Sequence, residues 1–397
     1  MFTLPLHLHG CTQTDRDFCG TTSGEASTST GGASTSTGGA STSTGGASTS
    51  TGEASTSTGE ASSSSGSSGN ENCSGSAKTC AGTCVETSTD PANCGDCGHS
   101  CQGAKCIGSM CQPLTLATGQ SGTYGIAVDT TNVYWANIKN ASIMKAPIGG
   151  GDAKPFVTGQ ADPQRVAIDA KNLYWTNKDG SVMQSPLAGG SITTLAVDAV
   201  DTSGSGNYCI YVTPKYVYYF SYTTSAIRRV PIGGGTATTV VNKVYNGVCI
   251  TADESYVYWT NSGDGSVNKF SLLDNILYQL AAAQAFPAGI VVDATNVYWA
   301  TNYNGNGKIM KSPLTNGGVP APVPLAGMQS ATYGIAVDDA SVYWSNKTDG
   351  TIVKVPIEGG NIVTLASGQI SPQGVAVDAS SVYWSNGSGE IMKVAKD

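Results

Sequence analysis

The amino-acid sequence predicts an all-β protein whose main part is a seven-bladed β-propeller. A repeat of about 40 residues occurs seven times between residues 112 and 397, and each copy carries a Tyr-Trp pair, or Tyr-Tyr in one copy. Within a copy, apolar residues recur with period two, which is typical of strands rather than helices. Each copy holds four short strand-like segments, and four strands per repeat make a propeller blade.

The aromatic pair sets the register of the copies. All six tryptophans of the chain occupy this one position, and the spacings between successive pairs are 40, 44, 40, 40, 45 and 40 residues. The pairs are Tyr134-Trp135, Tyr174-Trp175, Tyr218-Tyr219, Tyr258-Trp259, Tyr298-Trp299, Tyr343-Trp344 and Tyr383-Trp384.

The first copy predicts strands over residues 125–129, 133–137, 143–148 and 154–158, with Gly149, Gly150 and Gly151 turning the chain between the last two. In other copies an Asp-Gly pair precedes the third strand, which favours a tight hairpin turn. The seventh copy ends after its third strand. The segment Leu114-Thr115-Leu116-Ala117 matches the missing fourth strand, so we predict that this N-terminal strand completes the last blade and leaves no open sheet edge.

The repeat resembles that of the YWTD, NHL and TolB group of propellers, because segments such as Tyr134-Trp135-Ala136-Asn137 are similar to the YWTD signature with Asn for Asp. The resemblance covers residues 112–397 and implies the fold. It implies no single function, because propellers of this kind serve many tasks.

Composition divides the chain into four parts: a tail over residues 1–19, a linker over 20–72, a cysteine-rich module over 73–111 and the propeller over 112–397. The linker consists almost entirely of Ser, Thr, Gly and Ala, which cannot bury enough apolar surface to fold, so we expect disorder. Only 12% of all residues are charged, and the net charge is −8. The absence of a basic stripe argues against a nucleic-acid partner. No apolar run is long enough for a transmembrane helix.

The cysteine-rich module has eight cysteines in 39 residues, which leaves no room for an apolar core. We expect four disulfides of unspecified connectivity, with a zinc site that includes Cys94 and Cys97 as the alternative. The eight residues are Cys73, Cys80, Cys84, Cys94, Cys97, Cys101, Cys106 and Cys111. The stretch from Thr89 to Gly98 resembles the motif of stigma-specific-protein-like modules, which implies an extracellular spacer or adhesion module.

The tail contains Leu8-His9-Gly10-Cys11, which resembles a bacterial lipobox. We predict that Cys11 is lipidated and that a longer export signal precedes the given start; a Cys11–Cys19 disulfide in a disordered tail is the alternative. The cysteine content favours an oxidising compartment. The expected location is therefore secreted or at the cell surface, of the outer-membrane lipoprotein type.

Positions that differ between the copies are the candidates for ligand binding. The residue just before each first strand should surround one mouth of the central channel, and in five copies it is aromatic or an amide: Tyr124, Gln164, Tyr208, Tyr333 and Gln373. At the next position Arg165 is the one cation. It can anchor an anionic ligand or pair with Asp162, and ordinary loop packing is the alternative for the whole set. Cys209 and Cys249 occupy this same next position in neighbouring copies, so a disulfide between them or two free thiols is expected.

Positions shared by the copies should be structural. An aspartate recurs in six copies, and we expect it to cap turns or pair with a recurring basic residue: Asp129, Asp169, Asp253, Asp293, Asp338 and Asp378, with Thr213 in copy three; the basic set is Lys145, Arg229, Lys269, Lys311, Lys354 and Lys393. All three histidines, His7, His9 and His99, lie outside the propeller. That excludes histidine-based catalysis there, such as that of the seven-bladed streptogramin lyases.

We therefore predict a monomeric, non-catalytic binding protein with no cofactor and no metal, whose ligand is an unidentified protein, peptide or glycan. The alternatives are a secreted hydrolase or lyase with a metal in the central channel, and a structural spacer without a small ligand.

Overall fold

The structure is a computed structural model, and it describes residues 73–75, 77–198, 209–221, 223–244, 246–302, 305–314 and 321–396. The described residues belong to one compact unit, residues 73–397. The predictions for Cys11, for the tail and for the linker fall outside the described residues, as does Tyr208. The described residues include no helix long and apolar enough to cross a membrane.

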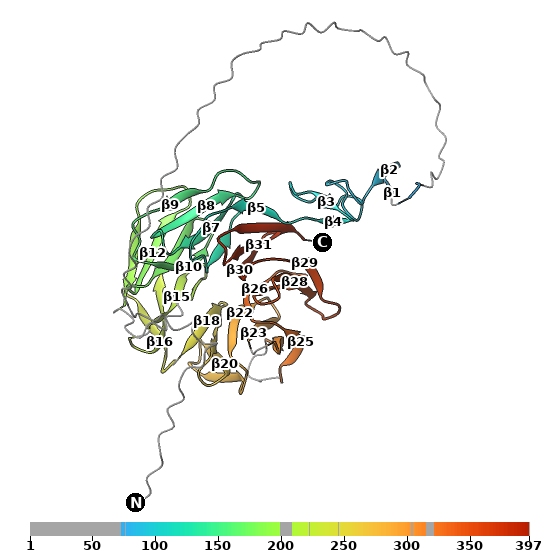
Figure 1. Ribbon diagram of the computed structural model, residues 1–397. Coiled ribbons are helices and arrows are strands. Elements are labelled where there is room, and N and C mark those ends of the chain that lie inside the picture. The colour runs from blue at the N-terminus through green and yellow to red at the C-terminus, as the bar shows by residue number, and fades with distance from the viewer. Residues whose placement is uncertain are drawn as a thin grey trace, which may run out of the picture. The chain divides into compact units, whose positions relative to one another are not determined.

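Seven four-stranded antiparallel sheets form the predicted propeller. In Figure 1 the first strands β10, β18, β22, β26 and β30 lie nearer the centre than the fourth strands β9, β25 and β29. Blade 1 consists of β6 (Ile126–Val128), β7 (Asn132–Asn137), β8 (Ser142–Pro147) and β9 (Lys154–Val157), and blade 2 of β10 (Pro163–Ile168), β11 (Asn172–Asn177), β12 (Ser181–Pro186) and β13 (Thr193–Val197). Blade 3 consists of β14 (Ile210–Val212), β15 (Tyr216–Ser221), β16 (Ala226–Pro231) and β17 (Thr238–Asn242), and blade 4 of β18 (Gly247–Ala252), β19 (Tyr256–Asn261), β20 (Ser266–Ser271) and β21 (Leu277–Ala281).

The last three blades follow the same order. Blade 5 consists of β22 (Pro287–Val292), β23 (Asn296–Thr301), β24 (Gly307–Pro313) and β25 (Val323–Gln329), and blade 6 of β26 (Thr332–Val337), β27 (Ser341–Asn346), β28 (Thr351–Pro356) and β29 (Val363–Ala366). Blade 7 consists of β30 (Pro372–Val377), β31 (Ser381–Asn386), β32 (Ile391–Ala395) and β5 (Leu114–Ala117).

The closing strand is the one that the sequence predicts. β5 pairs antiparallel with β32, with Ala117 opposite Ile391 and Leu114 opposite Lys393. The ring is also closed at its centre, because β30 of blade 7 contacts β6 of blade 1. The two ends of the propeller sequence therefore share one sheet.

Each junction between blades contains one tyrosine and one tryptophan, except the junction of blades 2 and 3, which contains Tyr174 and Tyr219. Neighbouring residues of a strand point to opposite faces of the sheet, so the two rings of a Tyr-Trp pair enter different junctions. Tyr134 of blade 1 packs with Trp175 of blade 2, and Trp135 packs with Tyr383 of blade 7. The other five junctions repeat the arrangement, with Tyr219 in the tryptophan place of blade 3. One dipeptide thus joins each blade to both of its neighbours.

Glycines let the first strands approach one another closely. A Cβ atom on Gly374 of blade 7 would lie 2.7 Å from the carbonyl oxygen of Tyr124 in blade 1, and one on Gly334 would come closer still to that of Gln373 in the next blade. Such an approach leaves no room for a side chain. Gly125 and Gly289 occupy the same position in blades 1 and 5, and a Cβ atom there would also meet backbone atoms of the next blade, at 3.0 Å.

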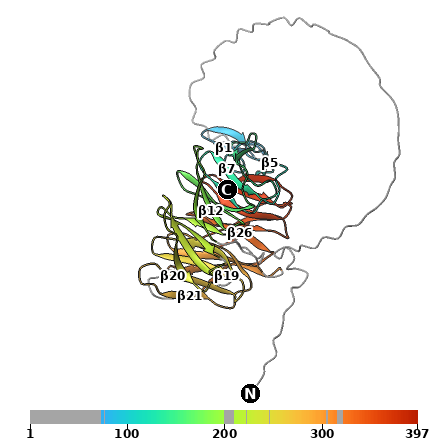
Figure 2. The same cartoon turned by 90° about the vertical axis from the view of Figure 1, so that its left-hand side faces the viewer.

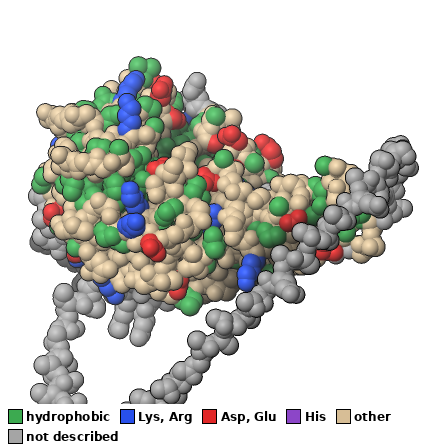
Figure 3. All heavy atoms as spheres, turned by 90° about the horizontal axis from the view of Figure 1, so that it is seen from above, with side chains coloured by type: hydrophobic (Ala, Val, Ile, Leu, Met, Phe, Trp, Pro, Cys, Tyr) green, Lys and Arg blue, Asp and Glu red, His purple; other side chains and the backbone are tan. Residues whose placement is uncertain are grey.

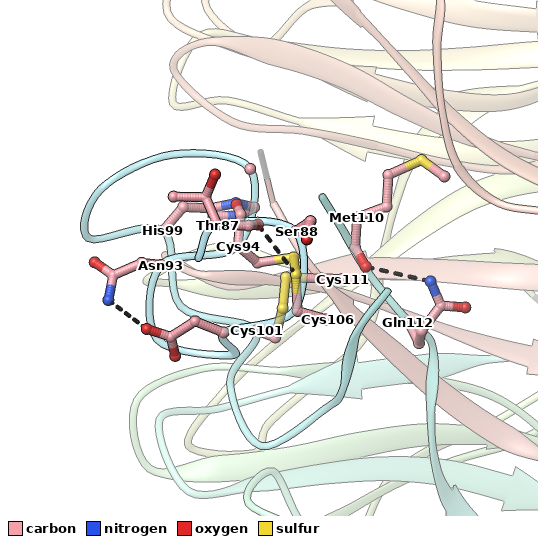
Figure 4. The surroundings of a disulfide bond; sticks show 12 residues. Thr87, Ser88, Asn93, Cys94, His99, Cys101, Cys106, Met110, Cys111 and Gln112 are labelled. Atoms are coloured by element: carbon pink, nitrogen blue, oxygen red, sulfur yellow. Dashed lines mark hydrogen bonds between the residues drawn. A yellow bond between two sulfur atoms is a disulfide. The ribbon is translucent and has the colours of Figure 1, made fainter. Parts of the chain in front are cut away.

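The cysteine-rich module contains two short hairpins, β1 (Ala77–Cys80) with β2 (Thr83–Glu86) and β3 (Cys106–Ile107) with β4 (Met110–Cys111). Its disulfides are Cys73–Cys84, Cys80–Cys97, Cys94–Cys106 and Cys101–Cys111. Figure 4 shows the last two side by side, with the strands of the propeller behind them. In Figures 1 and 2 the module lies beside β5. Its buried cysteines join the same apolar cluster as Val394 and Ala395 of blade 7.

Replacing Leu116 of β5 with alanine should lower the stability of the whole ring, because Leu116 is buried between blades 7 and 1. We expect a loss of about 3 kcal/mol and one cooperative transition at a lower melting temperature, measured by calorimetry. Thr115→Ala, at an exposed position of the same strand, is the control. A melting temperature equal to that of the control would show that β5 does not close the propeller.

Candidate functional site

The strand order gives the propeller two distinct faces. One, here called the turn face, carries the turns between the first and second strands of each blade and between the third and fourth. The opposite one, the loop face, carries the connections from blade to blade and the loops between the second and third strands. Lys396, which follows β32, bonds to Ser380, Asp338 and Asp378 of the turn face, and the cysteine module reaches Lys396. The module therefore adjoins the turn face.

On the turn face, the recurring aspartates hold their own turns. In blade 5, Oδ1 of Asp293 accepts the backbone N–H groups of Thr295 and Asn296, and Oδ2 accepts the hydroxyl of Tyr298 at 2.7 Å. The same three bonds recur at Asp129, Asp169, Asp253, Asp338 and Asp378. The recurring aspartates therefore cap their turns, as expected, and also hold the tyrosine of the Tyr-Trp pair. Two residues of the basic set, Lys269 and Lys393, interact electrostatically with Asp253 and Asp378.

These bonds shift the pKa values of both partners. Burial acts to raise the pKa of Asp293, but the N–H groups of Thr295 and Asn296 and the Tyr298 hydroxyl outweigh it, so the pKa is lowered. The pKa values of Asp129, Asp338 and Asp378 are lowered in the same way. Burial, together with the neighbouring Asp129, raises the pKa of Tyr134 to about 12. The carboxylates are therefore charged and the phenols neutral at physiological pH.

A glutamine that the sequence analysis does not single out binds the junction tryptophan on the loop face. In blade 1, Oε1 of Gln120 accepts the indole N–H of Trp135 at 3.1 Å and the side-chain amide of Asn137 at 3.0 Å. A glutamine lies fifteen residues before the tryptophan in five blades, and this fixed spacing is visible in the sequence. The five pairs are Gln120 with Trp135, Gln160 with Trp175, Gln284 with Trp299, Gln329 with Trp344 and Gln369 with Trp384.

Arg165 crosses the propeller axis on the loop face. It lies near the start of β10 in blade 2, and its Nη1 donates to the carbonyl oxygen of Tyr124 in blade 1 at 3.0 Å. Its Nη2 donates to the hydroxyl of Tyr333 in blade 6 at 3.2 Å, and the guanidinium carbon lies 5.4 Å from the centre of that ring. Blades 2 and 6 are not neighbours, so this contact spans the centre of the ring. No bond to Asp162, the alternative partner, is found among the described contacts of Arg165.

The other predicted residues of this set are placed differently. The side-chain amide of Gln164 turns back to the carbonyl oxygen of Asp162 at 3.0 Å. Gln373 is buried, its backbone carbonyl oxygen accepts the hydroxyl of Ser345 in blade 6 at 2.6 Å, and its side-chain Oε1 has no hydrogen-bond partner among the described residues. The structure therefore brings together Arg165, Tyr333 and the backbone of Tyr124, whereas the side chain of Gln164 bonds within its own blade.

Cys209 and Cys249 form a disulfide between the first strands of blades 3 and 4, with 5.2 Å between their Cα atoms. These are the blades in which the repeat is most altered. Thr213 replaces the turn aspartate of blade 3, and its hydroxyl accepts the N–H of Tyr216. In blade 4, Val244 occupies the position of the glutamine, fifteen residues before the tryptophan. The disulfide thus links the two blades that lack part of the shared bonding.

Exposed apolar side chains lie on the loop face, which also carries Arg165. Phe286, Met328 and Ile370 are 52%, 84% and 63% exposed. Phe286 and Ile370 lie in the connections that lead into blades 5 and 7, and Met328 lies near the end of β25, before the connection into blade 6. Phe286 and Met328 have φ angles of 48° and 54°. This left-handed conformation costs an ordinary residue about 1 kcal/mol. Glycine stands at the Met328 position in other blades, as Gly119, Gly159 and Gly368. We call these three side chains the apolar arc.

Charged side chains form no patch of one sign on the surface seen in Figure 3, where basic, acidic and hydrophobic groups alternate.

Within the described residues, one group of three side chains is close enough to share a metal ion, and it consists of Cys94, Cys101 and Cys106. All three are in disulfides, so they do not fit a metal.

The comparisons with known proteins agree with the two parts of the chain. Residues 48–113 match the Stigma-specific STIG1-like protein family. Among curated proteins, none matches the chain. Among solved structures, it is similar to a streptogramin B lyase, with 16% identity and a TM-score of 0.59 over 72% of this chain and 97% of that one.

Two further structures share the fold. One is a catalytically inactive histidine-to-alanine variant of virginiamycin B lyase from Staphylococcus aureus with quinupristin, at 14% identity and a TM-score of 0.60 over 72% of this chain and 99% of that one. The other is the WD40 propeller domain of Doa1, at 15% identity and a TM-score of 0.57 over 72% and 96%. Identities this low show the fold alone. With the five disulfides of its described residues and its STIG1-like module, the chain is an extracellular protein with a seven-bladed propeller.

Replacing Asp293 with asparagine should reduce stability at neutral pH by about 1 kcal/mol, because the turn loses a charged acceptor. The pKa of Asp293 is lowered by folding, so its contribution is present above the ordinary value of about 4 and is lost as the pH falls through the folded value. Denaturant titrations at neutral and acidic pH should therefore show a difference that shrinks below about pH 4. Asp152→Asn, at an exposed position, is the control. A difference that persists undiminished in acid would contradict the assigned role.

Proposed function

We propose that the protein is a non-catalytic extracellular binding protein whose loop face holds a protein or peptide ligand that carries a carboxylate. The observation that supports this most directly is the position of Arg165 across the propeller axis, between Tyr124 and Tyr333. No other blade has a cation at this place in the repeat.

The guanidinium suits a carboxylate for two reasons. It presents five N–H donors in a planar fork, and the bonds to Tyr124 and Tyr333 use two of them. The two tyrosines also fix its orientation before a ligand arrives, which reduces the entropy lost on binding. A ligand carboxylate at the axis therefore meets a donor group that is already in place.

The apolar arc favours a protein or peptide over a glycan. Aliphatic groups such as Met328 and Ile370 lower their free energy by contacting apolar side chains, whereas sugars present mainly hydroxyl groups. The arc and Arg165 share the loop face, so one extended segment with apolar residues and a carboxylate can contact both.

The described carboxylates give the enzyme alternative little support. The six recurring aspartates are bonded to their own turns and to tyrosine hydroxyls, on the face opposite Arg165. The propeller sequence also contains no histidine. The likeness to lyases rests on the fold, so we propose no second function.

A surface anchor through lipidated Cys11 is a further part of the proposal. It is supported by the lipobox-like segment from Leu8 to Cys11. Mass spectrometry of the mature N-terminus tests it, and a chain that begins with unmodified Met1 would rule it out.

Replacing Arg165 with glutamine should weaken ligand binding about tenfold or more, because a charged hydrogen bond to the ligand is lost. The probe is an array of peptides that combine aliphatic or aromatic residues with a free carboxylate, alongside a glycan array. Lys178→Gln removes an exposed cation of the same face and is the matched control. Binding that survives in the Arg165 variant, or binding to glycans alone, would overturn the proposal.

A further inference from the structure

His99 bridges the cysteine module and the propeller through both nitrogens of its ring. Nδ1 lies 2.5 Å from the carbonyl oxygen of Cys94, within the module, and Nε2 lies 3.1 Å from the carbonyl oxygen of Lys396, at the end of blade 7. Figure 4 shows the ring beside Cys94. Both partners are carbonyl oxygens, which only accept hydrogen bonds.

A neutral imidazole cannot satisfy this arrangement. It carries one N–H donor, and its other nitrogen is an acceptor that would face a carbonyl oxygen without a proton between them. The imidazolium carries an N–H on each nitrogen and can donate to both oxygens. The observed geometry therefore fits the protonated side chain.

We propose that His99 is a proton-dependent latch that holds the cysteine module against blade 7. When the ring loses a proton, it keeps one carbonyl partner and gives up the other. Since Cys94 belongs to the same module, and only residues 112 and 113 join that module to β5, the bond to Lys396 is the one that module movement can break.

The carbonyl oxygen of Lys396, which accepts the bond from His99, belongs to a residue that several hydrogen bonds hold in place. The N–H of Lys396 donates to the carbonyl oxygen of Ser380 at 2.8 Å. Its ammonium group donates to Asp338 at 2.6 Å and also to the carbonyl oxygen of Asp378. The latch therefore closes onto a segment that the turn face already holds.

The other charged groups near the latch titrate outside the relevant range. On the module, Asp96 pairs with Lys78 at 3.4 Å. The N–H of Cys97, then Lys78, and to a smaller extent His99 itself lower the pKa of Asp96. On the propeller, burial acts to raise the pKa of Asp338. The Lys396 side chain and the turn N–H groups outweigh burial, so the pKa of Asp338 is lowered. Because their pKa values are lowered, both carboxylates stay charged between about pH 5 and 8. A histidine ordinarily titrates within that range, and His99 is the only one in residues 73–397.

The test compares the full chain with His99→Gln by hydrogen exchange, measured at about pH 5 and about pH 8. At the lower pH, amides around Cys94 and at Lys396 should exchange about tenfold faster in the variant, because a charged hydrogen bond is missing. At the higher pH the two proteins should exchange alike. The double variant His7→Gln and His9→Gln is the matched control and should follow the wild type at both pH values.

Two results would overturn the latch: an equal difference at both pH values, which indicates a structural role without proton dependence, or no difference at either. The intact mass of His99→Gln under non-reducing conditions shows whether the module disulfides have formed. A variant that lacks them is replaced by His99→Asn in the same measurement. The outcome does not depend on whether Arg165 binds a ligand.

Discussion

The packing of a tyrosine from one blade against a tryptophan from the next is the interaction on which the rest of the structure depends. Each ring lies in a different junction because adjacent residues of a strand face opposite sides of its sheet. Large aromatic side chains bury much apolar area. In most blades the turn aspartates and the glutamines before the tryptophans accept their hydroxyl and indole N–H groups, whereas the Tyr219 hydroxyl and the Trp259 indole N–H are buried without a hydrogen-bond partner in the described part of the chain. A blade therefore obtains its apolar core only from its neighbours, which makes the closed ring the unit of stability.

The sequence predicts the fold well because this interaction repeats. Seven copies of one dipeptide set the number of blades and the register, and the unfinished seventh copy identifies the closing strand β5. The turn aspartates were expected to cap turns or to pair with basic residues, and the structure shows the capping. The bond from the Tyr134 hydroxyl to Asp129 was not predicted, although a buried phenol needs an acceptor and this one lies only five residues away.

The candidate site was predictable only as a set of positions. Departures from the repeat identify Arg165, Tyr124 and Tyr333, but the contact between Arg165 and Tyr333 joins residues 168 apart and depends on the curvature of the ring. The burial of Gln373 was not predictable from the repeat either, because it depends on how closely blade 6 packs against blade 7. The apolar arc was missed because its members do not occupy one repeat position; they share a face only after the connections fold.

The closing strand also determines how the propeller would bear a mechanical load. The chain enters β5 from the turn face, whereas Arg165 lies on the loop face. A pull on Gln112 would therefore reach the ring first through the pairing of β5 with β32. These hydrogen bonds would carry the load before any junction between blades, because β5 is the strand that follows the module directly. The strand that completes the ring is thus also the strand through which tension on the module would reach the propeller.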